Sequence, residues 1–78
     1  MHLTITRYLD ISPQAATERL ARATAATESP ADAQVRISGI DELATIQVSV
    51  PWSPERREEI ALAADRYATA LTRELVAA

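Results

Sequence analysis

The stretch from residue 43 to residue 75 constrains the fold of this 78-residue chain more than any other. Apolar and polar side chains alternate over residues 44–50, which is typical of a strand with one buried face and favours a strand over residues 43–50. Pro51 cannot donate a backbone hydrogen bond, so we expect the strand to stop there. Ser53-Pro54 then suits a helix start, with the serine side chain as N-cap and the proline in the first turn. The stretch therefore predicts a strand, a sharp turn and a long helix over residues 54–76.

The remaining elements predict a β-α-β-β-α order. Alternation favours strands over residues 2–9 and 34–40, and Ser12-Pro13 repeats the cap-and-proline start for a helix over residues 13–28. A loop is expected at residues 28–33, because the residue before a proline is pushed out of the helical region. Each helix has one inward stripe: Ala16, Leu20, Ala23 and Thr27 on the first, and Ile60, Ala64, Tyr67, Leu71 and Leu75 on the second.

Two positions in the strands stand out. Gly39 is the only glycine, and it predicts a hairpin turn near residues 39–42 in which it takes a positive φ or a bulge position. Arg7 interrupts the apolar face of the first strand. We expect it near the strand end, where its stem packs and its charge reaches water.

These elements favour one α+β domain over residues 1–78, a two-layer sandwich with both helices on one face of a three-stranded sheet. The other face would be polar and solvated. It would carry Thr4, Thr6, Tyr8, Gln34, Arg36, Ser38, Thr45, Gln47 and Ser49. The element order resembles that of a ferredoxin-like domain without its last strand, so a fourth strand is expected to be absent or supplied by another chain.

Composition narrows the classes of function. Eleven acidic and eight basic residues give a net charge of −3, which argues against sequence-independent binding of nucleic acid. The absence of cysteine excludes disulfides and cysteine-based zinc sites. No apolar run reaches membrane-spanning length and the start does not read as a signal peptide, so we expect a cytoplasmic protein without a membrane contact. Lysine, asparagine and phenylalanine are all missing, which indicates a high-GC genome.

Catalytic chemistry finds little support in the residue types. His2 is the only histidine, so neither a serine nucleophile nor a transition-metal site has the partners that it needs. The carboxylates lie at loops and helix starts rather than within apolar runs, where burial would raise a pKa. We therefore expect no enzyme, no catalytic or metal-binding residue and no cofactor.

A few side chains are candidates for an interface. Trp52, just before the helix start, either covers the end of the core or anchors a partner. Further candidates are Tyr8 and Arg36 on the open sheet face and Leu62 and Val76 on the back of the second helix. Arg56-Arg57 is interpreted either as part of a salt-bridged helix start or as an anion contact at the helix N-terminus.

The sequence thus predicts a small noncatalytic protein–protein interaction or regulatory module, of the phage-encoded or accessory kind. A homodimer is expected, because so short a chain has a marginal core and its sheet would have exposed edges. One alternative is a nucleic-acid-associated regulator that uses Arg36, Arg56 and Arg57. The other is a ligand-binding or enzyme-accessory domain that uses the open polar sheet face.

Overall fold

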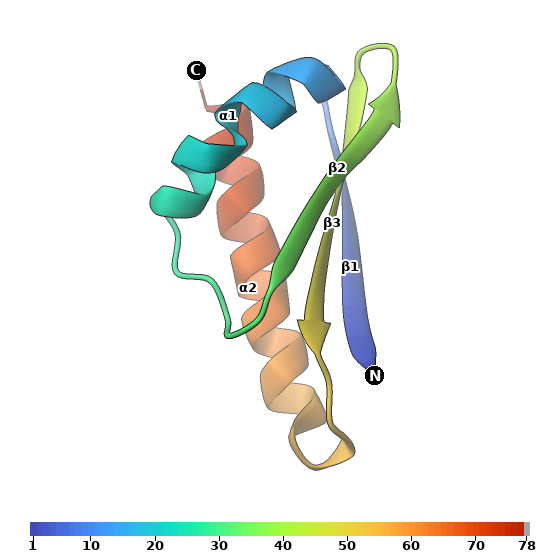
Figure 1. Ribbon diagram of the computed structural model, residues 1–78, viewed down its shortest axis with the longest axis vertical. Helices are drawn as coiled ribbons and strands as arrows, with labels where there is room; N and C mark the ends of the chain where they lie inside the picture. The colour runs from blue at the N-terminus through green and yellow to red at the C-terminus, as the bar shows by residue number, and fades with distance from the viewer. Residues whose placement is uncertain (78) are drawn as a thin grey trace.

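The computed structural model describes residues 1–77 and has the predicted β-α-β-β-α order (Figure 1). Its elements are β1 (His2–Leu9), α1 (Pro13–Ala25), β2 (Gln34–Ile40), β3 (Leu43–Pro51), a 3₁₀ turn (Pro54–Arg56) and α2 (Arg57–Val76). Both helices contact the three-stranded sheet, which confirms the α+β class.

The sheet has the order β1-β3-β2, with β3 antiparallel to both neighbours. β1 and β2 therefore run parallel, with β3 between them, as in a split β-α-β unit. The pairing runs without a bulge from His2 opposite Pro51 to Leu9 opposite Ala44 on one side. β3 is central because its alternation is the most complete. Its inward side chains are at most 2% exposed, namely Ala44, Ile46, Val48 and Val50.

The core lies between the sheet and the two helices. Small side chains on α1 and α2 let the helices approach the sheet closely, and four of them have no exposed surface: Ala16, Ala23, Ala64 and Ala68. The bulk comes from larger side chains that are also fully buried, chiefly Ile46 of β3 and Leu71 and Leu75 of α2. The predicted inward stripe of the second helix is confirmed, with Ile60 only partly buried.

The first helix is shorter than predicted. α1 ends at Ala25 rather than at residue 28. The hydroxyls of Thr24 and Thr27 donate to carbonyls of the preceding turn, at 3.0 Å from Leu20 O and Ala23 O respectively. Such side-chain bonds compete with helix continuation, so the helix closes before the loop that contains Pro30.

The start of the second helix also differs from the expectation. The Ser12 side chain caps α1, because Ala15 N–H donates to its Oγ at 3.1 Å. Ser53 makes no such bond, so its predicted role as a side-chain cap is wrong. The chain instead tightens into the 3₁₀ turn, where Arg56 N–H donates to the Ser53 carbonyl at 3.2 Å. β3 also includes Pro51, one residue beyond the predicted end.

The hairpin between β2 and β3 is confirmed. Ile40 pairs with Leu43, and Asp41 has a φ of 58° in the connecting turn. Gly39 has a φ of 130°, and a Cβ there would lie 2.2 Å from the Leu43 carbonyl oxygen. Glycine is therefore required both by the backbone angle and by the close approach of β3.

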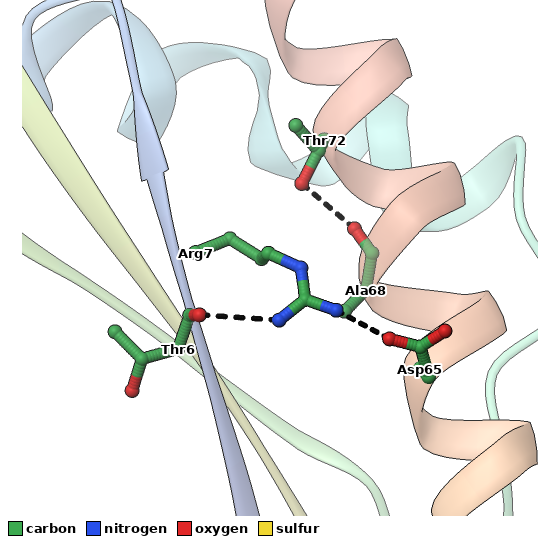
Figure 2. Close-up of polar contacts among 5 residues, drawn as sticks. All are labelled: Thr6, Arg7, Asp65, Ala68 and Thr72. Atoms are coloured by element: carbon green, nitrogen blue, oxygen red, sulfur yellow. Dashed lines mark hydrogen bonds and ion pairs between the residues drawn. The ribbon is translucent and has the colours of Figure 1, made fainter.

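Arg7 lies two residues before the last residue of β1, near the strand end as expected. It sits within β1 opposite Ile46, on the side of the sheet that faces the helices. Its guanidinium forms an ion pair with Asp65 of α2 and donates to the Thr6 carbonyl at 3.3 Å (Figure 2). A charge on this inner face is tolerated because β1 is an edge strand, which leaves the Arg7 side chain 37% exposed.

Candidate functional site

A cleft opens beside Trp52, at the end of the molecule where β3 turns into α2. It has a volume of about 390 Å³. Three segments line it: the loop before β2, the end of β3 and the first turns of α2. The lining residues are Pro30, Ala31, Asp32, Val50, Pro51, Trp52, Ser53, Arg56, Glu59, Ile60 and Ala63.

Trp52 is held at this place by its backbone. Its N–H donates to the Met1 carbonyl at 3.0 Å, which continues the β1–β3 pairing past Pro51. The side chain is partly buried and lines the cleft. The indole thus presents surface to the cleft. The neighbouring Ser53 hydroxyl is free of any capping bond.

Charged side chains form the rim of the cleft. The Arg56 guanidinium pairs with the Glu59 carboxylate through two bonds, Nε to Oε2 at 3.1 Å and Nη2 to Oε1 at 3.0 Å. This pair raises the pKa of Arg56 and lowers the pKa of Glu59. Asp32 lies exposed on the opposite loop with a φ of 58°. The helix start is therefore salt-bridged at Arg56, while Arg57 is exposed beside it.

The open face of the sheet carries the predicted polar side chains. Tyr8 lies opposite Thr45, and Arg36 lies opposite Gln47, so β3 separates the two candidates. A shallow hollow of about 670 Å³ lies beside Arg36. Its lining is mostly polar: Thr4, Gln34, Val35, Arg36, Gln47 and Ser49.

This face also has an apolar feature that the sequence interpretation missed. Tyr8, Ile40 and Leu43 are 80%, 80% and 59% exposed at the hairpin end of the open face. Leu43 lies between the other two, because it pairs with Ile40 and is two strand positions from the residue opposite Tyr8. We call these three residues the hairpin patch. A signal was present in the sequence, because Ile40 shares the outward alternation of Arg36 and lies two strand positions beyond Ser38.

Leu62 and Val76 are exposed on α2, at 51% and 42%. They lie about 21 Å apart along the helix axis. Val76 lies close to Asp65 around the helix, whereas Leu62 lies nearly opposite the buried row of α2, on its back. The five interface candidates thus occupy three separate places: the Trp52 cleft, the open sheet face and the outer side of α2.

The described residues contain no cluster of three or more His, Cys, Asp or Glu side chains that could hold a metal ion. Apart from Tyr67, which carries a phenol and is 4% exposed, none of the polar or charged residues among them is buried. His2 lies exposed at the start of β1. No helix within residues 1–77 is long and apolar enough to cross a membrane.

Comparison with protein-family models, curated proteins and solved structures finds no match for this chain. Function is therefore inferred from its surfaces alone.

Proposed function

We propose that this protein is a small noncatalytic protein-binding module, and that the Trp52 cleft takes an apolar side chain from a partner protein. One observation carries the proposal: a cleft of about 390 Å³ in which the only tryptophan of the chain is partly exposed. Binding sites are commonly concave, largely apolar and about 300–1,000 Å³ in volume. Tryptophan is enriched among the residues that dominate binding energy at interfaces.

The lining indicates the chemistry of the partner. Trp52, Pro51 and Ile60 offer an apolar wall to an aliphatic or aromatic side chain. On the rim, Arg56 and Glu59 neutralise each other, which leaves the Asp32 carboxylate as the unbalanced charge. The partner segment is therefore expected to present an apolar side chain to the cleft and a basic side chain next to it. The net charge of −3 favours approach of such a segment.

The small size of the domain favours self-association. We propose a homodimer that works in the cytoplasm as an accessory or regulatory protein, because self-association supports a domain with so small a core.

A second candidate function is the binding of a small polar ligand on the open sheet face. The hollow beside Arg36 favours it, since amide, hydroxyl and guanidinium groups converge there. The hollow lacks an apolar wall, which most small-molecule sites use for affinity. A polar metabolite that raises the melting temperature of the wild type but not of Arg36→Ala would establish this function. Nucleic-acid binding is supported least, because Arg56 is paired with Glu59 and Arg36 lies on another surface.

The protein-binding proposal is tested by selecting random peptides on the wild-type protein and then measuring the binding of each selected peptide to Trp52→Ala. We expect enriched peptides to share an apolar residue next to Lys or Arg. Asp32→Asn keeps the shape of the loop, since asparagine tolerates a positive φ, and it should weaken the selected peptides. Ile40→Ser, which changes the hairpin patch only, serves as the matched control and should bind them normally.

Two results would contradict the assignment. Peptides that bind Trp52→Ala as well as the wild type would remove the cleft from the function. Peptides lost in Ile40→Ser but retained in Trp52→Ala would move the binding site to the hairpin patch.

A further inference from the structure

The outer edge of β1 presents unpaired backbone groups. Facing residues of antiparallel strands alternate between pairs that exchange hydrogen bonds and pairs that do not. Trp52 N–H donates to Met1 O, whereas Pro51, opposite His2, has no N–H to donate. The odd-numbered residues of β1 therefore bond to β3. The even-numbered ones, His2, Thr4, Thr6 and Tyr8, direct their N–H and C=O groups away from it.

A contact of Thr6 supports this assignment. Its carbonyl accepts a bond at 3.3 Å from the Arg7 side chain, as expected for a group that β3 does not occupy (Figure 2). Within residues 1–77, β1 pairs with β3 alone. The strand is eight residues long and has no proline, glycine or bulge to block pairing. Its one charged group that could oppose pairing, Arg7, is directed to Asp65 on the helix side.

We propose that a second copy of this chain occupies this edge, paired antiparallel along β1 with the two-fold axis beside Ile5. This inference deepens the self-association in the proposed function. Even-numbered residues must exchange bonds across the new edge, so Thr4 would face the partner's Thr6 and His2 the partner's Tyr8. Ile5 would then face its own copy on the helix side, where apolar contact is favourable.

Charge selects this register over its neighbour. With the axis beside Ile5, the two Arg7 side chains lie four strand positions apart, about 13 Å. With the axis beside Thr6, they would lie on a diagonal about 7–8 Å apart, where like charges repel. The partner's Leu3 would instead lie next to the aliphatic stem of Arg7.

Cross-linking tests the register directly. The chain has no cysteine, so Ile5→Cys adds a single thiol. Facing residues that exchange no hydrogen bonds have Cβ atoms about 4.5–5.5 Å apart, near the separation that a disulfide needs. We expect mild oxidation of the folded protein to give a covalent dimer. Ser38→Cys, exposed on β2 and far from the axis, is the control and should give little.

Sedimentation of the full chain over a concentration series tests the dimer itself. Thr6→Pro removes only an edge N–H, so it should keep the circular dichroism of the fold and abolish the dimer.

A wild type that stays monomeric throughout, or an Ile5→Cys variant that cross-links no faster than Ser38→Cys, would overturn the inference. If Thr6→Pro fails to fold, the cross-linking contrast between Ile5→Cys and Ser38→Cys decides. A monomeric chain that still selects peptides at Trp52 would leave the protein-binding function intact, so the two proposals fail separately.

Discussion

At the scale of single residues, the backbone angles of a few positions decide what the hairpin tolerates. Gly39 has a φ of 130°, and the Leu43 carbonyl closes the space that a Cβ needs. Asp41 and Asp32 also take left-handed angles, at a lower cost because aspartate visits that region more easily than most residues. These positions fix the turns that shape the open face and the rim of the Trp52 cleft.

Gly39→Ala is expected to destabilise the fold by roughly 1–3 kcal/mol, because β3 must shift and the new residue keeps an unfavourable φ. Urea unfolding followed by circular dichroism measures the change. Ser38→Ala, the neighbouring exposed position, should change the free energy of unfolding by less than about 0.5 kcal/mol. Equal effects of the two substitutions would show that the close approach at Gly39 does not limit stability.

The phenol of Tyr67 gives the fold a dependence on alkaline pH. Burial raises its pKa above the ordinary value of 10.0, and the polar contact with Thr27 offsets part of that increase. The neutral phenol is favoured in the folded state, so its contribution to stability is complete below pH 10 and is lost as pH rises toward the folded pKa. We expect the free energy of unfolding to fall above about pH 10 more steeply in the wild type than in Tyr67→Phe. Parallel profiles would contradict this.

At the scale of elements, strand pairing followed the alternation closely. β1 and β2 match their predicted ranges, and the inward rows are the predicted ones, because burial on one face determines the register. The helix ends were predicted less well. The threonine hydroxyls that close α1 and the 3₁₀ turn before α2 depend on backbone bonds that residue types alone do not specify.

The two Ser-Pro pairs illustrate this limit, since they look alike in the sequence and differ in the structure. Only Ser12 accepts a capping bond, from Ala15 N–H. Ser12→Ala should therefore lower the free energy of unfolding by about 1 kcal/mol. Ser53→Ala should change it by less than about 0.5 kcal/mol. Thermal or urea unfolding of the two variants measures both changes. A larger loss of stability in Ser53→Ala than in Ser12→Ala would contradict the assignment of Ser12 as the capping residue.

At the scale of the whole molecule, the candidate site was predictable only in part. Trp52 stood out as a lone aromatic residue between strand and helix, but the cleft beside it also needs the loop at Pro30, Ala31 and Asp32. Only the tertiary fold brings that loop to the cleft, so no local sequence pattern predicts its contribution to the cleft. The hairpin patch was not predicted for a different reason. Ile40 and Leu43 flank the turn, and their exposure depends on the alternation continuing to the strand ends.

The same scale explains why the surfaces are separable. The Trp52 cleft lies at the end of the molecule where β3 meets α2, whereas the hairpin patch lies at the other end of β3. The proposed dimer edge runs along β1 between them (Figure 1), and it shares Tyr8 with the hairpin patch. A substitution in the Trp52 cleft is therefore expected to leave binding at the hairpin patch nearly unchanged, and the reverse.

The central claim, that the Trp52 cleft binds a protein segment, is tested most directly by the fluorescence of Trp52 itself. It is the only tryptophan, so its emission reports on this cleft alone. Titration with a selected peptide should shift the Trp52 emission to the blue and protect it from quenching by acrylamide. The dissociation constant of the peptide should be larger for Asp32→Asn than for Ile40→Ser. A peptide that binds by calorimetry but leaves both the emission and the quenching unchanged would show that binding occurs elsewhere on the molecule.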